Sequence, residues 1–442
     1  MVIGLFLKQK NIVYNWLGAI IIFLAPFNLF YKWSENSAYI NGILSDYLIP
    51  KIWLVEIPIL LTLFIWVIDY LRKFITASNS KKSKTISEIL LNIKNNKLFV
   101  SLLLAFFLRQ LFSINSLSSL LITLRLSELF LFGLFIKNNI KYISQKIIYI
   151  AITISILLQV SLANYQFFSQ KNLFPYFVSG ETNLTGSLNI AKLFFKKGIY
   201  VAPYGSTAHP NILAGYLVIM IIILTRLIQK NSIVKTTIEV TRNEIKNKKI
   251  IQKYLVGWLG ISLISWTLFL TQSYSAIISF IVFITLKTFP KLVKKLSYLL
   301  FFITALTIPI MLFLLSQKTS FISIDRRVFL NQQAILSFTE NILWGTGLNN
   351  FLYSLKTINT SEIVRFLQPA HNIFLLWLTE TGLLGIALIA VLQKQIRKHV
   401  SLLTLFVLLP IVSLDHYFLT QWIGNYMLIL MVYLLELELE LN

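Results

Sequence analysis

The chain has 442 residues, of which 56% are hydrophobic and 13% are charged, with a formal net charge of +23 and no cysteine. Water-facing side chains cannot cover so much apolar surface, so the composition excludes a soluble globule and predicts an all-α integral membrane protein. The lack of cysteine excludes disulfides, thiol nucleophiles and thiolate metal sites. With only four scattered histidines, the sequence implies no metal and no cofactor.

Apolar segments of spanning or near-spanning length follow one another along the chain. A spanning helix needs about 20 apolar residues, and we predict about twelve transmembrane helices in a single polytopic domain over residues 1–442. The first run continues through Pro26 without a small-residue cleavage site, so we expect a retained helix rather than a signal peptide. The predicted spans are 12–31, 52–71, 98–114, 117–136, 147–168, 210–229, 255–271, 274–289, 297–316, 371–392, 400–414 and 421–437.

Basic residues are distributed unevenly between the predicted loops. If the amino terminus is cytoplasmic, most of the 40 lysines and arginines fall in inside loops such as 72–97 and 226–253, as the positive-inside rule requires. We therefore expect both termini to be cytoplasmic. This topology and contact with anionic headgroups account for the net charge. Since the basic loops carry no interleaved aromatic platform, we expect no nucleic-acid partner.

Two predicted outer loops, 169–209 and 317–370, are much longer than the other connections, and loops of such length are usually functional. The second loop begins with an amphipathic segment that should form a helix on or near the membrane surface. Gly345 and Gly347 should form a turn after it. Arg326 and Arg327 at its start would point toward an anion at the outer leaflet, or bind lipid headgroups nonspecifically. The residues on one face of this predicted helix are Arg327, Leu330, Ala334, Ile335 and Phe338.

Residues 368–385, QPAHNIFLLWLTETGLLG, place a His-Asn pair after a proline at the opening of an apolar helix. A histidine at the membrane surface can exchange protons with water and still touch a lipid-borne substrate. Imidazole is also the side chain best suited to general base catalysis near neutral pH. His371 is therefore a candidate base, and the alternative is a structural residue at the interface.

Together these features resemble the O-antigen ligase and polymerase superfamily, which are polytopic bacterial glycosyltransferases. The resemblance rests on Arg327 at the start of the large loop, Ala334 seven positions later, the turn GTGLNNF at 345–351 and the helix opening at His371. Three further runs are similar to family motifs: HPNILAGYL from His209, LTQSYSA from Leu270 and DHYFLTQWIGNY from Asp415. The motifs occur in the family's order over residues 200–425.

The resemblance implies transfer of a glycan from undecaprenyl diphosphate to an acceptor hydroxyl, without a metal, on the extracytoplasmic side of the bacterial inner membrane. Diphosphate is already a good leaving group. Arg327 would hold it, because a guanidinium binds phosphate bidentately and offsets the charge that develops there. His371 would take the proton of the acceptor hydroxyl. The implied partners are the lipid-linked donor, a glycolipid, glycan or protein acceptor, and membrane lipid.

Two arginines inside predicted spans are further candidates. Arg109 and Arg125 lie where a charge is costly and usually faces a cavity or a partner. Gripping a lipid phosphate is one role for them. For Arg125 the alternative is an ion pair with Glu128, three residues later on the same helical face.

The remaining histidines and asparagines near helix starts have structural alternatives as well. His209 precedes Pro210, which suits the first position of a helix, so a structural role is favoured. Asn211 and Asn372 can satisfy backbone groups at helix starts. His416 can orient a substrate or form a hydrogen-bonded pair with Asp415. The candidate substrate-binding residues are Arg326, Gln368, Asn372, Tyr274, His209, Asn211, Arg109, Arg125 and His416.

The chain departs from the family pattern at two positions. Many members carry an arginine where Tyr274 and Ala202 stand here. The missing cations count against an unaltered diphosphate site. The alternatives are that other cations compensate, that the donor has diverged or that activity is lost. The cations available for compensation are Arg326, Lys196, Lys197, Arg109 and Arg125.

A ligase is the reading that we favour. A polymerase that joins repeat units on the same carrier uses the same donor chemistry, and a protein O-glycosyltransferase is a further variant. A secondary transporter also fits the number of spans, but the sequence has no clear internal repeat or pair of broken helices, which such folds usually show.

Overall fold

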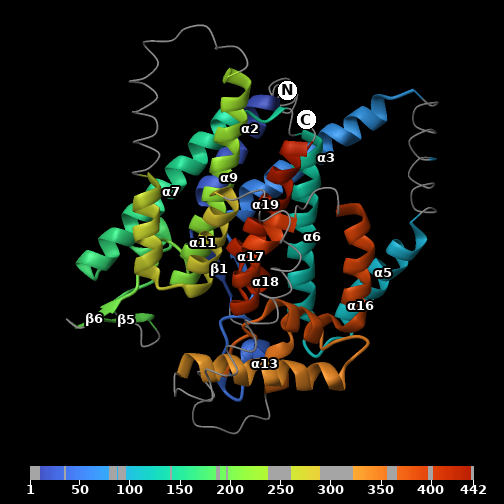
Figure 1. The fold of residues 1–442 in the computed structure, drawn as a ribbon. Coiled ribbons are helices and arrows are strands. Elements are labelled where there is room, and N and C mark those ends of the chain that lie inside the picture. Colours follow the sequence, from blue (N-terminus) through green and yellow to red (C-terminus); the bar gives the residue numbers. More distant parts are fainter. Residues whose placement is uncertain are drawn as a thin grey trace. The chain divides into compact units, whose positions relative to one another are not determined.

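The computed structural model describes residues 10–33, 36–78, 87, 96–139, 142–185, 190–195, 198–236, 260–288, 322–355, 366–396 and 402–439. The chain forms two compact units. Unit 1 comprises Met1–Phe30, Trp53–Pro58 and Asn139–Pro290, and unit 2 comprises Tyr31–Ile52, Ile59–Asn138 and Lys291–Asn442. Each unit consists mainly of α-helices (Figure 1). The predicted helical class is therefore confirmed for the described part of the chain.

A buried helix, α9 (Pro210–Thr236), lies at the centre of unit 1. Its residues 212–223 are all buried, as expected of a helix that is apolar on every side. It packs against α7 (Gln145–Ser169) and α11 (Tyr274–Thr288), and α7 also packs against α2 (Lys10–Leu24). A further apolar helix, Gly260–Thr271, precedes α11.

The first long loop of the sequence contains regular structure of its own in unit 1. It holds the short helix α8 (Tyr176–Ser179) and an antiparallel pair of strands, β5 (Lys192–Phe195) and β6 (Gly198–Val201). Gln166 near the end of α7 fastens this loop: its side-chain oxygen accepts the backbone N–H groups of Tyr204 and Gly205, and its amide donates to Glu181 at 2.8 Å.

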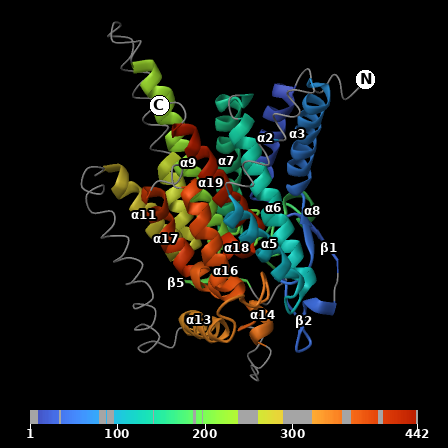
Figure 2. The same cartoon turned by 90° about the vertical axis from the view of Figure 1, so that its right-hand side faces the viewer.

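Unit 2 contains most of α3 (Glu56–Thr76) and eight further α-helices among the described residues, which come from residues 97–139 and 322–439. At one end of these helices lie α13, α14 and β2 (Figure 2). Helix α13 packs against α16, and α16 packs against α5. The helices are α5 (Lys97–Leu111), α6 (Ser116–Asn139), α13 (Ile322–Glu340), α14 (Phe351–Ser354), α16 (Ile373–Ile396), α17 (Leu402–Leu414), α18 (Tyr417–Thr420) and α19 (Trp422–Leu439).

A small β-structure follows α2. Strand β1 (Phe30–Lys32) pairs with β4 (Lys51–Trp53), and between them lie η1 (Asn36–Ala38) and the hairpin of β2 (Tyr39–Ile40) and β3 (Ile43–Leu44). The hairpin turn is Asn41-Gly42, with φ of 50° and 78°. Both residues need positive φ in a two-residue hairpin turn, which is why Asn-Gly is favoured there.

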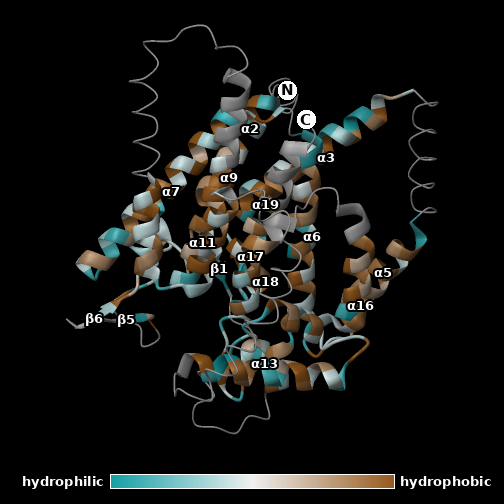
Figure 3. Cartoon of the chain, viewed as in Figure 1, coloured by the Kyte–Doolittle hydropathy of each residue, from teal (hydrophilic) through white to brown (hydrophobic). Residues whose placement is uncertain are grey.

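Each predicted span that the described residues cover overlaps a helix. The predicted span 297–316 lies outside the described residues, as do Lys196, Lys197 and His399. Within the described residues, three helices are long and apolar enough to cross a membrane: Ser116–Asn139, Gln145–Ser169 and Ile373–Leu392. Figure 3 shows predominantly hydrophobic residues along these helices and a mixture along α13. The chain is a helical membrane protein, and its twelve spans stay a prediction.

The first predicted span, 12–31, is too long. Helix α2 ends at Leu24, and the chain then turns toward β1. The physical reason is Pro26, which has no backbone N–H and whose ring clashes with the preceding helical turn. The apolar run therefore continues beyond the helix.

The helix that follows His371 is broken in its middle. Gly382 has φ 62° and ψ −158°, which is not helical. A Cβ atom there would lie 2.6 Å from the backbone nitrogen of Gly345, so only glycine fits. The turn after α13 replaces the lost helical hydrogen bonds. The N–H groups of Thr346 and Gly347 donate to the carbonyls of Thr379 and Glu380, and those of Leu383 and Leu384 donate to the carbonyls of Ile342 and Leu343.

Candidate functional site

The amphipathic helix predicted in the second long loop is α13, and its packing sets the direction of Arg327. Leu330 and Ala334 are fully buried and pack with Ala370 and Leu376 at the start of α16. The hydroxyl of Thr379 donates to the Ala334 carbonyl at 2.8 Å. Ile335 was expected on the same face but is exposed. Arg327 precedes Leu330 by three residues, so it shares the face that meets α16.

The predicted turn at 345–351 is confirmed and is fixed to its surroundings by a buried asparagine. Gly345 and Gly347 have φ of 64° and 100°. The side chain of Asn350 accepts the backbone N–H of Asn115 at 2.6 Å and donates to Ser119 at 2.7 Å. The carboxylate of Glu380 faces the N–H of the following residue, Phe351, at 3.4 Å. These contacts join the end of α13 to α6 and α16.

His371 lies just before the first turn of α16. The side chain of Asn372 accepts the N–H of Leu375 at 3.1 Å, so Asn372 caps this helix as predicted. The imidazole is buried, with 8% exposure, and its Nε2 lies 3.3 Å from the side-chain oxygen of Gln368. Gln368 and His371 therefore meet at the helix start.

The carboxylate of Asp415 joins the two residues for which catalysis was predicted. Arg327 Nη2 and His371 Nδ1 each lie 4.0 Å from the same oxygen, Oδ1 of Asp415. Asp415 is 4% exposed, so this charge acts in a medium that screens it weakly. A separation of 4.0 Å is beyond hydrogen-bond length, which makes these contacts electrostatic. Helix α13, the segment just before α16 and the turn after α17 each supply one member.

Two aromatic rings extend this cluster. The rings of His371 and His416 are 4.8 Å apart and edge-to-face, and Tyr47 lies edge-to-face on His416 at 5.4 Å. The Nδ1 atom of His416 shares a 2.6 Å hydrogen bond with the hydroxyl of Thr420. We call Tyr47, Arg327, His371, Asp415 and His416 the histidine cluster.

Charges around the cluster act on its phenols. Burial raises the pKa of Tyr47 to about 12; the nearby Arg326 lowers it in part, and the carboxylates of Asp46 and Asp415 raise it. Burial, with Asp415 adding to it, also raises the pKa of Tyr417 well above its ordinary value. Both phenols therefore stay neutral near neutral pH. The charge of Arg326 acts on Tyr47 of the cluster.

The two arginines predicted inside spans bind backbone carbonyls of unit 2. Arg109 donates to the carbonyl of Gly345 at 2.6 Å, and Arg125 donates to the carbonyl of Lys51 at 3.0 Å. Arg109 thereby supports the glycine turn. A role of either arginine in gripping phosphate stays a prediction.

The other three predicted residues belong to unit 1. The ring of His209 accepts the N–H of Asn211 at 3.2 Å through Nδ1 and packs on Tyr204, as a cap of α9. Tyr274 starts α11 with 73% exposure, whereas Ala202 is buried. These contacts of His209 favour the structural role. Among the described residues, no group of three or more acidic, histidine or cysteine side chains could hold a metal.

Sequence reasoning missed part of this cluster. Asp415 was considered only as the start of a motif and as a hydrogen-bonding partner of His416, and Tyr47 was not considered. The predicted topology was the signal that could have found them. With a cytoplasmic amino terminus, the predicted spans place the loops that hold Tyr47, Arg327 and Asp415 on the same, outer side of the membrane. Nothing in the local sequence distinguishes Tyr47 from the other tyrosines.

The fold and the cluster define a helical membrane protein in which a histidine, an arginine and a buried carboxylate converge. Residues 259–390 match the family model described as O-antigen ligase, and this range includes Arg327, the glycine turn and His371. The match confirms the resemblance to the O-antigen ligase superfamily and thus indicates a glycosyltransferase-like enzyme with a lipid-linked glycan and an acceptor as partners. Among curated proteins, none matches the chain.

Proposed function

We propose that the protein transfers a glycan from undecaprenyl diphosphate to an acceptor hydroxyl at the extracytoplasmic face of the inner membrane. The observation that carries the proposal is the convergence of Arg327 and His371 on Asp415, because glycan transfer from a diphosphate needs a cation and a base close together. The family match supports the donor class.

Arg327 is suited to the leaving group. Its side chain is 21% exposed and lies 4.0 Å from Oδ1 of Asp415, so a ligand can reach it. A guanidinium offers two parallel N–H donors to the diphosphate oxygens and offsets their growing charge as the glycosidic bond breaks. Arg326 adds positive charge beside it. The reaction then needs no metal to neutralise the leaving group.

His371 is suited to the acceptor. A carboxylate near Nδ1 favours the tautomer that carries its proton there, which leaves Nε2 to accept the proton of the acceptor hydroxyl. Asp415 also stabilises the imidazolium that results. The side-chain oxygen of Gln368 lies 3.3 Å from Nε2, and because an amide oxygen can only accept, it would accept a hydrogen bond from Nε2 once this nitrogen carries the proton of the acceptor hydroxyl. The acceptor oxygen then attacks the anomeric carbon, and the diphosphate leaves with the bonding electrons.

The arrangement of the loops agrees with a site on one side of the membrane. The segments 32–51, 317–370 and 415–420 were all predicted outside, and Tyr47, Arg327 and Asp415 from these segments share the histidine cluster. An orientation with this end outward would put the cluster where lipid-linked glycans are used.

Reconstitution tests the reaction. The purified protein in liposomes should transfer a defined undecaprenyl-diphosphate oligosaccharide to a glycolipid acceptor. Elongation of a second lipid-linked oligosaccharide would instead show a polymerase, and labelling of a protein would show a protein O-glycosyltransferase. Absence of transfer to all three acceptors would overturn the proposal.

Orientation can be tested separately because the chain has no cysteine. Glu340→Cys at the exposed end of α13 should react with an impermeant maleimide added to intact cells, since α13 is predicted outside. The matched control is Ser87→Cys in the predicted inside loop, which is also exposed and should react only after the membrane is opened. The reverse pattern would contradict the topology and the side assigned to the site.

Asp415→Asn should lower turnover while the protein still folds, because the amide keeps the shape and removes the charge that orients His371. Loss of a directly bonded aspartate costs about 10⁴-fold, and we expect a smaller loss of about 10–10³-fold since the separation is 4.0 Å. Rates of glycan transfer measure it. Glu340→Gln, an exposed carboxylate of α13, is the control and should be neutral. Unchanged turnover in Asp415→Asn would remove the aspartate from the mechanism.

A further inference from the structure

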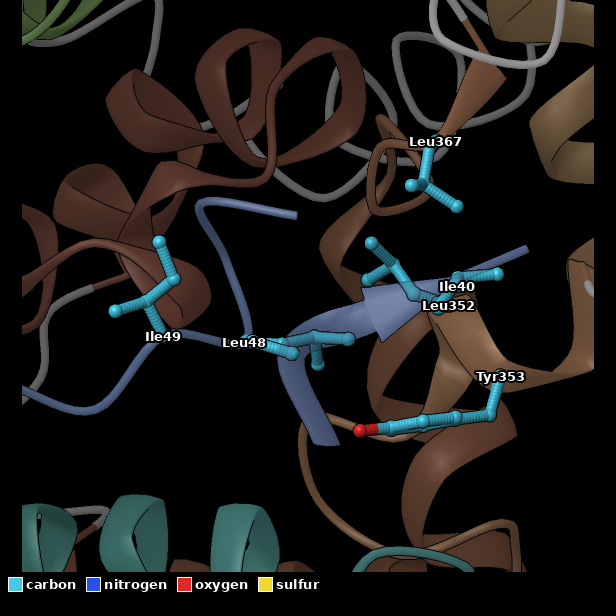
Figure 4. Packing of buried hydrophobic residues seen from close by; sticks show 7 residues of the cluster. Ile40, Leu48, Ile49, Leu352, Tyr353 and Leu367 are labelled. Atoms are coloured by element: carbon cyan, nitrogen blue, oxygen red, sulfur yellow. The ribbon is translucent and has the colours of Figure 1, made fainter. Parts of the chain in front are cut away.

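A segment near the amino terminus, residues 38–49, packs against residues next to the site. Residues 38–49 pack in a small apolar core with residues that follow α13, and Figure 4 shows Ile40 beside Leu352, with Tyr353 and Leu367 around them. The segment lies outside the range that matches the family model, 259–390. The core consists of Ala38, Ile40, Leu48, Ile49, Leu352, Tyr353 and Leu367.

Hydrogen bonds fix the same segment at both ends. The side-chain amide of Asn349, in the glycine turn, donates to the carbonyl of Tyr47 at 3.0 Å. The hydroxyl of Tyr353 donates to the carbonyl of Ser37. Since Leu367 directly precedes Gln368, one apolar core holds both the backbone that carries Tyr47 and the backbone that leads to His371.

Three rings from three distant parts of the chain then form a row. Tyr47 meets His416 at 5.4 Å with an interplanar angle of 75°, and His416 meets His371 at 4.8 Å with an angle of 66°. Edge-to-face contacts are directional, because the positive edge of one ring faces the negative face of the next. The row therefore restricts the rotation of the histidine rings.

We propose that Tyr47 is a positioning residue for His371: its ring, acting through His416, holds the imidazole in the orientation that directs Nδ1 toward Asp415. This inference rests on the proposed function for the role of His371 as a base. Ring packing with His416 orients the imidazole in addition to its contacts with Gln368 at 3.3 Å and Asp415 at 4.0 Å.

The ring of Tyr47, rather than its hydroxyl, is the part that acts. The contact of Tyr47 with His416 is made ring to ring, with 5.4 Å between the centroids. A phenylalanine therefore preserves the proposed role, and an aliphatic residue of similar bulk does not. This difference separates positioning through the ring from substrate contact through the hydroxyl.

Turnover in reconstituted liposomes gives the first test. Tyr47→Ala and Tyr47→Leu should lower kcat by about 10²-fold with an unchanged KM for the donor, the loss typical of a misplaced catalytic group. Tyr47→Phe should keep kcat within about threefold of wild type, since the ring remains. The matched control is Tyr39→Ala, a 45% exposed tyrosine of the same hairpin segment, and it should leave kcat unchanged.

Histidine-labelled NMR of the substrate-free protein gives a second test that does not need activity. The chain has four histidines, so each signal can be assigned by substitution. Tyr47→Ala and Tyr47→Leu should move the signals of His416 and His371 and leave that of His209 in place, which also shows that the variants fold. Tyr47→Phe should preserve the wild-type pattern, because it keeps the ring current.

The outcomes are distinct. Wild-type turnover with an unmoved His371 signal in Tyr47→Ala would overturn the inference. Equal losses in Tyr47→Phe and Tyr47→Ala would overturn it too, since the hydroxyl would then be the active part. If the wild-type protein transfers no glycan, the proposed function fails, while the NMR comparison still decides whether Tyr47 positions His371.

Discussion

His371→Ala should lower glycan transfer by about 10²–10⁴-fold, the contribution that a general base typically makes. The acceptor hydroxyl is a poor nucleophile until its proton is taken, and the imidazole of His371 lies near both Gln368 and Asp415. The variant should still insert and bind the lipid-linked donor, because the buried ring contributes little to binding at the diphosphate. Transfer rates and donor binding in liposomes measure the two effects separately.

Matched substitutions make this result specific. His209→Ala should be mild, since His209 caps α9 in unit 1 through its contact with Asn211. Asn372→Ala should be intermediate because it removes the cap of the helix that places His371. The wild-type rate should also fall at acidic pH, since a protonated imidazole cannot accept a proton. Near-wild-type transfer by His371→Ala across the pH range would leave His371 as a structural residue.

Arg327→Ala should lose about 2–5 kcal/mol of transition-state stabilisation, the range for removing one partner of a hydrogen-bonded charge pair. The reason is that the diphosphate gains charge as the glycosidic bond breaks, and the guanidinium is then needed most. Arg327→Lys should also lose much of the activity, because an ammonium keeps the charge but cannot form two parallel hydrogen bonds. The decrease in kcat/KM for the donor measures both losses.

Arg326→Ala is the matched control for position along α13. Arg326 acts on Tyr47 through its charge, whereas Arg327 lies 4.0 Å from Asp415. We therefore expect a smaller loss in Arg326→Ala than in Arg327→Ala. Full activity of Arg327→Ala together with inactivity of Arg326→Ala would show that the neighbouring arginine holds the leaving group.

Much of the architecture could be predicted because it depends on local patterns. The apolar runs coincide with helices wherever the structure describes them, and α13 and the glycine turn follow from their spacing in the sequence. The exceptions are also local in origin. Pro26 ends α2 earlier than the apolar run suggests, and Gly382 breaks α16 because the turn at Gly345 approaches too closely for a side chain.

The candidate site could be predicted only in part. Arg327 and His371 belong to segments that resemble family motifs, so each could be named without knowledge of the other's position. His209 and Tyr274 carry comparable signals but lie in unit 1, where His209 caps a helix. Arg109 was expected to face a cavity or a partner, and its observed contact is a backbone carbonyl of the glycine turn. Residue type alone does not separate these roles.

The sequence by itself indicated the class of the protein and most of the long helices among the described residues, and its resemblance to family motifs named the two residues on which catalysis is proposed to depend. The class follows from the composition of the whole chain. The helices and the motifs follow from patterns that extend over only a few helical turns. Only the tertiary structure decided that Asp415 stands between Arg327 and His371 and that Tyr47 reaches the same cluster. Tyr47 lies hundreds of residues from the other three, which are themselves tens of residues apart. Their proximity depends on how apolar faces such as that of Leu330 and Ala334 pack, which no local pattern encodes.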